Sequence, residues 1–459
     1  MFKTLKNAWK VPELKNKLLF TLLIIILYRL GSAIPVPYFE YGESLAQTEL
    51  FSNGIFGFLS ILSGSALTQG TLLALGVSPY ITASIVMQLL TIAIPPLERL
   101  SKEGEEGKKK INFITRIITV ILSIITAVGY TLFVIRTDGG AYFHETGDTT
   151  AFIIFAGAVM VCCYCAGAML VMWLAEKIND HGIGNGISMI LFANIVAGFV
   201  SQAYSLYQAT FSHNGNAFNY TGLIIAIATI IGLLMILMLI VWMSDAERRI
   251  PIQYAKRVVG RKMYGGQNTN LPIKVNMTGV MPIIFANSIV AVPSTIRAFM
   301  GQSNDPNWFM RFVDNWFNYE SVAYLIVFLI LLIAFAYFYV AISFNPIEVA
   351  NNIKNNGGNI PGIRPGRPTV EFIKKVLNRV TLVGALLVAI IACVPMLAGV
   401  ISAPIVDAMP ASRFAEAMYY VRFLAFGGSS LMIVVGVALE TTRDLEAQMS
   451  LRNYKGFLD

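Results

Sequence analysis

Charged residues are scarce in this sequence, and they avoid the middle of its long apolar blocks. Only 13% of the 459 residues are Asp, Glu, Lys or Arg, whereas 56% are hydrophobic. The ionisable residues close to the blocks lie at block ends, at Arg29, Arg116, Arg136, Arg297 and Glu440. Ion-coupled carriers and proton pumps need ionisable groups near the bilayer midplane, because those groups bind or relay the coupling ion. The sequence therefore argues against both classes.

Residues that carry metal, redox or nucleotide chemistry are also rare or absent. There are three histidines and four cysteines, and no histidine lies near Cys162, Cys163, Cys165 or Cys393 in the sequence. All four cysteines fall inside apolar blocks, so we interpret them as small apolar residues of helices rather than metal ligands. Neither a GxxxxGK[ST] phosphate loop nor an HExxH motif occurs. We therefore expect no catalytic residue, no metal and no cofactor.

Ten apolar blocks are present, and each is long enough to cross a membrane as a helix. The blocks lie at residues 18–34, 76–94, 113–135, 151–174, 183–203, 221–243, 279–299, 322–344, 378–398 and 424–440. Lipid offers no hydrogen-bond partner to exposed backbone, so helices rather than strands are expected to span. The predicted fold class is an all-α membrane protein with ten transmembrane helices.

Basic residues are divided unequally between the two sides of this predicted bundle. Six of the 34 Lys and Arg residues fall on the side that the odd-numbered connections occupy: Arg29, Arg136, Arg297, Arg311, Arg413 and Arg422. Cytoplasmic connections carry the excess of Lys and Arg. Because an even number of spans leaves both ends on one side, we expect a cytoplasmic N-terminus at 1–17 and a cytoplasmic tail at 441–459.

A short repeat divides the predicted helices into two halves. "GVSPYITA" in the second block matches "GVMPIIFA" in the seventh at five of eight positions. Five spans is an odd number, so the halves, residues 18–203 and 204–440, would insert with opposite orientation, as in inverted-repeat transporters. Pro79 and Pro282 each favour a helix start, and Pro95 should end the second span.

Neutral polar residues replace the missing charges inside the blocks. Ser84, Gln88 and Thr91 recur on one face of the second span, and Asn287 follows Pro282 in the seventh. Such groups hold membrane helices together by about 1 kcal/mol each. That strength suits an interface that must open, although permanent helix packing is the other interpretation.

Three connections are unusual in composition or length. The external stretch 54–70 is apolar, broken by glycines and too short to cross, so it should re-enter the bundle or lie at the interface. The cytoplasmic loops 244–280 and 346–379 are long and basic, and the first should form a strand, a turn and a returning strand. Loops of that length tend to be functional, and docking of a large anionic partner is one use.

Several longer motifs resemble those of the SecY family, the channel subunits of Sec protein translocases. They occur in order along nearly the whole chain: "YRLGSAIPVP", "LGVSPYITASIVMQLL", "GIGNGISM", "ERRIPIQYAKR", "LPIKVNMTGVMPIIFANS", "NPIEVANNIKNNGGNIPGIRPG" and "NYKGF". The resemblance implies two five-helix halves around an hourglass pore, with a lateral gate between the second and seventh spans. It also implies passage of unfolded polypeptide across the cytoplasmic membrane, and sideways into lipid, without an ATPase of its own.

The resemblance assigns roles to particular residues. The implied pore ring comprises Ser78, Ile81, Ile187, Leu191, Met281 and Ile433, where Ser78 departs from the usual apolar residue. The implied lateral gate comprises Pro79, Thr82, Ser84, Gln88, Pro282 and Asn287. The implied plug is a short helix within 54–68 that includes Phe56, Phe58, Leu59, Ile61, Leu62 and Gly64. The implied docking residues are Arg248, Arg249, Lys256, Arg257, Arg261, Lys262 and Arg364.

The same resemblance implies partners. The partners are the subunits SecE and SecG, the SecA motor ATPase, the translating ribosome, unfolded preproteins with their signal sequences, and membrane lipid.

Composition alone leaves two rival functions. An inverted-repeat solute carrier would show saturable uptake of a small solute. An intramembrane enzyme would lose activity when one buried polar residue is replaced.

Overall fold

The computed structural model describes residues 2–39, 60, 62–136, 150–211, 220–254, 257–259, 262–264, 268–299, 307–317, 321–408 and 427–455. Among the predicted plug and docking residues, Phe56, Phe58, Leu59, Ile61, Lys256 and Arg261 lie outside these ranges.

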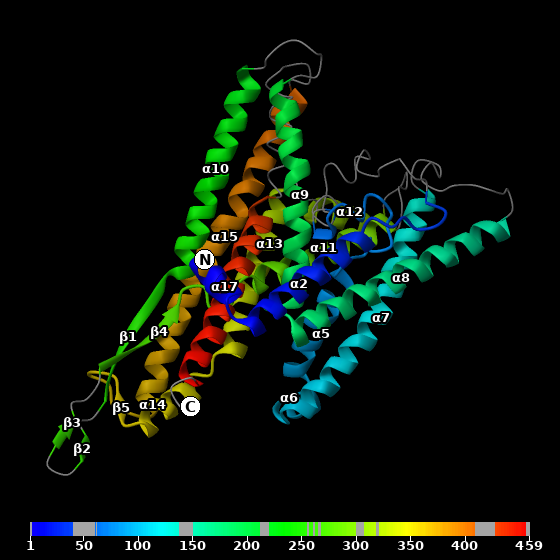
Figure 1. Ribbon diagram of the computed structural model, residues 1–459. Coiled ribbons are helices and arrows are strands. Elements are labelled where there is room, and N and C mark those ends of the chain that lie inside the picture. The colour runs from blue at the N-terminus through cyan, green and yellow to red at the C-terminus, as the bar shows by residue number, and fades with distance from the viewer. Residues whose placement is uncertain are drawn as a thin grey trace.

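Each of the ten apolar blocks falls on one long helix (Figure 1). These helices are α2 (Pro12–Gly31), α5 (Ser78–Ala93), α7 (Glu105–Arg136), α8 (Thr150–His181), α9 (Gly186–Phe211), α10 (Tyr220–Asp245), α11 (Met281–Phe299), α13 (Val322–Ser343), α15 (Arg367–Ala408) and α17 (Gly427–Lys455). The predicted helical membrane architecture is confirmed. Many of these helices are longer than their apolar block, because the polar residues next to the block are also helical.

Five of the described helical stretches are long and apolar enough to cross a membrane by themselves: 105–135, 151–181, 226–245, 322–355 and 367–394. If α5 and α6 (Pro95–Lys102) together form one bent span, the described residues contain six such stretches. Shorter apolar stretches lie at Gly186–Val200 and Met281–Arg297. The protein is therefore a multi-pass membrane protein, and the count of ten spans stays a prediction.

Proline sets the end of α5 as the sequence predicts. The α5 helix ends at Ala93, and α6 begins at Pro95 after a bend of 101°. Pro95 has no N–H to continue the ladder, and its ring disfavours a helical conformation at Ile94. Ile94 accordingly takes extended dihedrals, with φ −110° and ψ 111°.

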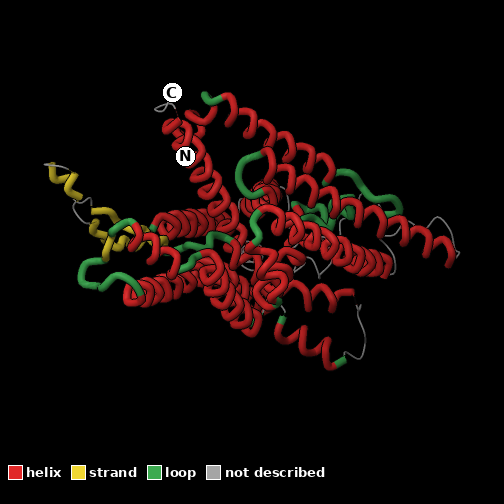
Figure 2. The backbone as a smooth tube through the Cα atoms, turned by 90° about the horizontal axis from the view of Figure 1, so that it is seen from below, coloured by secondary structure: helices red, strands yellow, loops and turns green. Residues whose placement is uncertain are grey.

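The two basic loops form one small folded unit at one end of the bundle (Figure 2). Strand β1 (Glu247–Tyr254) pairs antiparallel with β4 (Asn268–Lys274), from Glu247 opposite Lys274 to Gln253 opposite Asn268. The predicted strand, turn and returning strand are therefore confirmed, with a second hairpin, β2 (Arg257–Val259) and β3 (Lys262–Tyr264), in the intervening segment. The second loop contributes helix α14 (Pro346–Asn355) and strand β5 (Gly358–Asn359), which pairs with β1.

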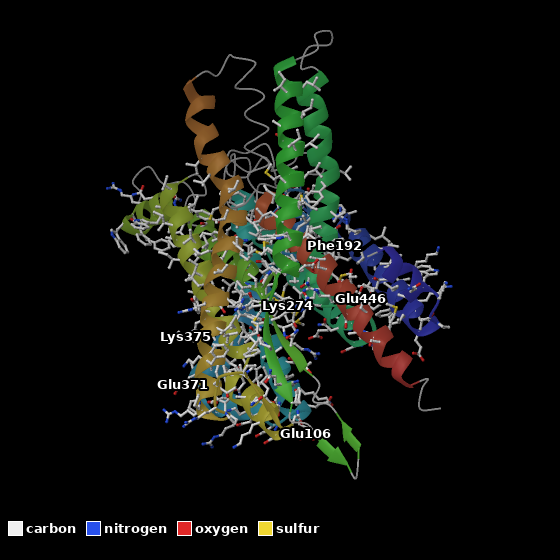
Figure 3. The ribbon with its side chains drawn as sticks, turned by 90° about the vertical axis from the view of Figure 1, so that its left-hand side faces the viewer. Glu106, Phe192, Lys274, Glu371, Lys375 and Glu446 are labelled. Carbon is white, nitrogen blue, oxygen red and sulfur yellow. The ribbon has the colours of Figure 1, made fainter. Side chains whose placement is uncertain are left out.

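A separate hydrophobic cluster holds this unit together. Ile250 and Ile252 of β1, Ile353 of α14 and Ile373 of α15 are all buried in it. Figure 3 places the charged side chains Glu106, Glu371 and Lys375 toward the same end of the molecule as the strands, whereas Phe192 lies among the helices. Charged side chains therefore gather at the end that the excess of Lys and Arg residues assigns to the cytoplasm.

The first helix of the chain packs against the last one, α17. Helix α1 (Phe2–Trp9) contacts α17, and the Thr4 hydroxyl donates to a Glu446 carboxylate oxygen at 2.9 Å. Ala8, Leu14 and Leu445 share a small buried cluster there. This proximity agrees with an even number of membrane crossings.

Candidate functional site: a cavity between the repeated helices

The two copies of the short repeat adopt the same local geometry. Gly76 and Gly279 both have left-handed φ angles, 54° and 63°, which favour glycine. The next residues, Val77 and Val280, are buried, and a helix then begins at Ser78 in α5 and at Met281 in α11. Proline is the second residue of each helix, where its missing N–H costs nothing. The sequence repeat is therefore a repeated helix start.

A cavity of about 330 Å³ lies between these helices and is mostly apolar in lining. Four predicted ring residues, Ser78, Ile81, Leu191 and Ile433, line it, together with Leu62 from the predicted plug. Ile187 and Met281 lie outside the lining, but they pack against the same hydrophobic core. The structure thus brings together residues from α5, α9 and α17 that are up to 355 positions apart in the sequence.

The predicted gate residues divide into two groups. Pro79, Thr82 and Asn287 line the cavity, and helices α5 and α11 contact each other along it. Asn287 is 4% exposed, and its Nδ2 makes no hydrogen bond within the described part of the chain. Pro282 instead lies beside α13 and α15.

The other two gate residues form a small contact on the surface of α5. Gln88 Nε2 donates to Ser84 Oγ at 3.4 Å, so these residues share a helix face as the spacing predicts. Neither side chain lines the cavity.

The described end of the predicted plug is held by three helices. Asn194 of α9 donates from Nδ2 to the carbonyl of Leu62 at 2.8 Å, and to the hydroxyl of Tyr28 on α2 at 2.8 Å. Arg29 of α2 reaches the Gly64 carbonyl at 3.5 Å, and the Tyr130 hydroxyl of α7 donates to the Leu67 carbonyl. These contacts close the cavity on one side with backbone rather than with side chains alone.

The described end of the predicted plug segment leaves the helical conformation after Ser63. Helical conformation reaches only Ser63, and residues 64–68 form turns. Gly64 and Ser65 have φ angles of 64° and 69°, which a right-handed helix excludes. The Ser63 hydroxyl accepts from the Leu67 N–H at 3.1 Å, so a side chain replaces helical bonding at this turn.

Sequence reasoning did not identify Asn194 as part of this site. Asn194 lies three residues after Leu191 and seven after Ile187, so a helical wheel places it on the same face as both. The polar amide of Asn194 on this otherwise apolar helix face could therefore have indicated a functional position from the sequence. Its partners could not be predicted, because Leu62 and Tyr28 lie 132 and 166 residues away in the sequence.

Three predicted docking residues are exposed at the charged end of the molecule. Arg248 and Arg249 lie on β1, where Arg249 Nε is 2.6 Å from a Glu247 oxygen, and Arg364 lies in the second loop. Because β5 pairs with β1, residues of both loops belong to one surface. Arg257 and Lys262 occupy the β2–β3 hairpin. Within the described ranges, no three His, Cys, Asp or Glu side chains gather to hold a metal ion.

A second group of cations lies where this surface meets α17. Desolvation of its ammonium group, together with the nearby Arg443, lowers the pKa of Lys274, whereas Asp245 and Glu247 act in the opposite direction. Arg443 donates to the Ser244 carbonyl at 2.7 Å and lies 3.0 Å from an Asp245 oxygen. The Asp245 and Glu247 carboxylates balance these two cations, so the junction is a contact of mixed charge between the loop surface and α17.

Comparison with known proteins agrees with this arrangement. A family model described as SecY matches residues 71–442. The protein translocase subunit SecY of Streptomyces scabiei is 42% identical over 465 residues, covering 100% of both chains. The corresponding subunit of Bacillus subtilis (strain 168) is 36% identical over 459 residues, again covering 100% of both.

Solved structures show the same fold at lower identity. A protein-conducting channel is 19% identical with a TM-score of 0.62, covering 96% of each chain. Sec61 in the canine ribosome-channel complex from the endoplasmic reticulum is 17% identical with a TM-score of 0.59, covering 96% of each chain. The family match and the full-length relatives together show that the chain belongs to the SecY family of protein translocase subunits, which are channel proteins rather than enzymes.

Proposed function

We propose that this chain is a gated conduit that passes unfolded polypeptide across the bacterial cytoplasmic membrane and releases membrane segments sideways into lipid. The observation that carries the proposal is the cavity in which Ser78, Ile81, Leu191 and Ile433 meet the Leu62 end of the plug segment. Both termini would be cytoplasmic, in accord with the basic loops and with the contact between α1 and α17. The two halves, residues 18–203 and 204–440, would part around this cavity.

An apolar constriction suits passage of polypeptides of arbitrary sequence. Ile81, Leu191 and Ile433 offer no hydrogen bond or charge to a passing chain, so they give it no strong binding site. The same apolar ring holds back ions by dewetting when the chain is absent. Ser78 is the polar exception, and the adjacent Val77, which also lines the cavity, supplies apolar surface beside it.

The lateral gate would lie along the contact between α5 and α11. The polar groups on the cavity side of this contact add no strong bond across it. The Thr82 hydroxyl donates to the Ser78 carbonyl of its own helix at 3.1 Å, and Asn287 Nδ2 has no partner among the described residues. Opening would hydrate the Asn287 amide, whose Nδ2 has no partner in the described part of the closed arrangement. That gain offsets part of the cost of separating the apolar surfaces of the two helices.

External partners would supply the driving force and complete the channel. We assign the surface formed by both basic loops to the SecA motor ATPase and the translating ribosome, and the flanks of the two halves to SecE and SecG. Exposed arginines at positions 248, 249 and 364 suit ribosomal RNA phosphates and acidic protein surfaces. A relative of the same fold, Sec61, is described in a ribosome-channel complex.

Crosslinking from the ring tests the conduit. A photoreactive residue at Ile187 or Leu191, in vesicles that contain a secretory chain stalled part-way, is expected to crosslink to the stalled chain. The same residue at Val200, which is 74% exposed on the same helix, is the control and is expected to label lipid. Labelling of lipid from Leu191 as well, with no polypeptide adduct, would show that the cavity is not the path.

Charge reversal tests the docking surface. Arg248→Glu and Arg364→Glu are each expected to weaken ribosome and SecA binding about tenfold, or about 1.4 kcal/mol, because each replaces an attraction by a repulsion. The control is Lys102→Glu on α6, an exposed lysine that pairs with Glu98. Affinity can be measured by cosedimentation or fluorescence titration at two salt concentrations. Equal losses in all three variants would indicate net charge rather than this surface.

A further inference from the structure

Helix α12 (Trp308–Trp316) carries a row of exposed aromatic side chains between α11 and α13. Trp308, Phe312 and Trp316 recur every four residues and are 80%, 40% and 47% exposed. Their rings stack in sequence, with centroids 5.8 Å apart for the first pair and 6.2 Å for the second. We call these three residues the aromatic row.

The aromatic row is not the face by which α12 packs on the protein. Met310 and Val313 supply that face and are 4% and 2% exposed. Arg311, Asp314 and Asn315 supply a third, polar face. Burying each aromatic ring is worth about 1.5–3 kcal/mol, so a stacked row left in water would forgo several kcal/mol. Helix α12 therefore has one face that packs on the protein, one polar face and one exposed aromatic face. The aromatic face needs an environment other than water.

Apolar surface continues from the flanking helices toward α12. Val322 and Ile326, in the first turns of α13, are 59% and 50% exposed. On α11, Val292 and Ile296 are 42% and 45% exposed and line the open cavity between α5 and α11. Both helices contact α12. The exposed apolar surface of α13 lies outside that cavity and reaches the helix that carries the aromatic row. Trp rings, which combine an apolar body with an N–H donor, concentrate at the boundary between acyl chains and headgroups.

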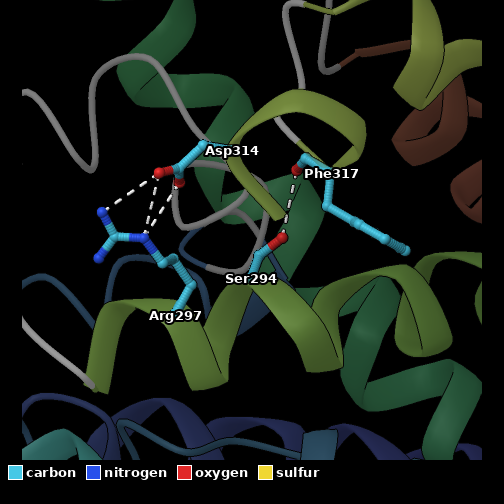
Figure 4. Close-up of polar contacts among 4 residues, drawn as sticks. All are labelled: Ser294, Arg297, Asp314 and Phe317. Atoms are coloured by element: carbon cyan, nitrogen blue, oxygen red, sulfur yellow. Dashed lines mark hydrogen bonds and ion pairs between the residues drawn. The ribbon is translucent and has the colours of Figure 1, made fainter. Parts of the chain in front are cut away.

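Two polar contacts join α12 to the last turns of α11 (Figure 4). Arg297 Nε lies 3.1 Å from one carboxylate oxygen of Asp314, and the Ser294 hydroxyl donates to the Phe317 carbonyl at 3.2 Å. Ser294 and Arg297 are three residues apart on α11, so both contacts come from one face of that helix. The aromatic row is therefore attached to the end of the helix that carries Asn287 at its other end.

We propose that the aromatic row binds the acyl–headgroup boundary of the outer leaflet, and that α12 thereby anchors the end of the gate helix α11 to the membrane surface. The proposal rests on the cytoplasmic placement of both termini and of the basic loops in the proposed function, which puts the connection between α11 and α13 on the external side. The occupant is lipid rather than protein, because the row adjoins the exposed apolar surface of α13, which lies outside the cavity.

Fluorescence quenching tests where the aromatic row lies. Two tryptophans remain, Trp308 and Trp316, after Trp9, Trp173 and Trp242 are replaced by phenylalanine. In the full translocase in phosphatidylcholine vesicles, bromine near the headgroup end of the acyl chains is expected to quench them more than bromine near the bilayer centre. Interfacial helices lie about 5–10 Å deep, so aqueous iodide is expected to quench them little. A variant that keeps only Trp173, exposed on α8, confirms that the brominated lipids reach the protein.

Spin labelling tests the anchor separately from transport. A label at Ile296, in a variant without the four cysteines, is expected to become more mobile when the aromatic row is changed to serine, and also when Asp314→Asn removes the ion pair.

Strong iodide quenching would place the row in water and overturn the proposal. Protection from both quenchers would mean that a protein partner or a second copy covers it, which also overturns the proposal. Lipid quenching with unchanged mobility at Ile296 would overturn the anchor. None of these results depends on whether polypeptide passes the cavity.

Discussion

Replacing Gly64 by alanine is expected to raise the resting ion conductance of the channel. Gly64 has a φ of 64°, and a left-handed conformation costs other residues about 1–2 kcal/mol. An added Cβ would also lie 2.5 Å from Arg29 Nη1 and 3.0 Å from Asn194 Oδ1. Both side chains hold the plug segment, so the substitution strains the closed arrangement and displaces two of its contacts.

The size of the effect follows from that strain. A loss of about 2 kcal/mol from the closed state raises the displaced fraction of the plug by up to about 30-fold. The measurement is single-channel or bulk ion conductance of the reconstituted translocase without substrate. Gly104→Ala is the control, since Gly104 also has a positive φ, 78°, but nothing lies within 4 Å of its added Cβ. Unchanged conductance in Gly64→Ala, or an equal rise in Gly104→Ala, would show that the plug contacts do not keep the channel closed.

The second large effect is expected at Gly167 of α8, where alanine should destabilise the fold. An added Cβ would lie 1.9 Å from the backbone carbonyl oxygen of Leu72. That carbonyl is part of the backbone and cannot swing aside like a side chain, and the segment is also tied to the residues that follow α2 by the bond from the Leu72 N–H to the Ile34 carbonyl at 2.8 Å. The two segments must therefore separate, at a cost of about 3 kcal/mol.

Thermal unfolding of the purified translocase in detergent measures this cost. Gly157→Ala on the same helix is the matched control, because its Cβ would meet only side-chain carbons, at 3.8 Å. Alanine has the higher helix propensity, so the control is expected to keep or slightly raise the melting temperature. Gly167→Ala should also shift the stretch that leads into α5, and thereby the position of Ser78. Equal melting temperatures for the two variants would contradict the close backbone packing.

Local features of this protein could be read from the sequence because their causes are local. Proline at 79 and 282, with a flexible glycine before each, predicted two helix starts, and Pro95 predicted the end of α5. The apolar blocks predicted the ten helices, and the composition of residues 244–280 predicted the β1–β4 hairpin. Within the predicted plug segment the helix ends at Ser63, because Gly64 and Ser65 turn left-handed, and the sequence pattern did not specify this boundary.

Contacts between distant segments were decided only by the tertiary structure. The sequence pattern did not single out Asn194, whose partners Leu62 and Tyr28 lie 132 and 166 residues away. It predicted two basic loops, but not their union through β5 and β1. The family resemblance implies a gate role for Pro282, which the structure places beside α13 and α15. A helix pattern specifies which face is apolar, while the neighbour that covers this face depends on how all the helices pack at once.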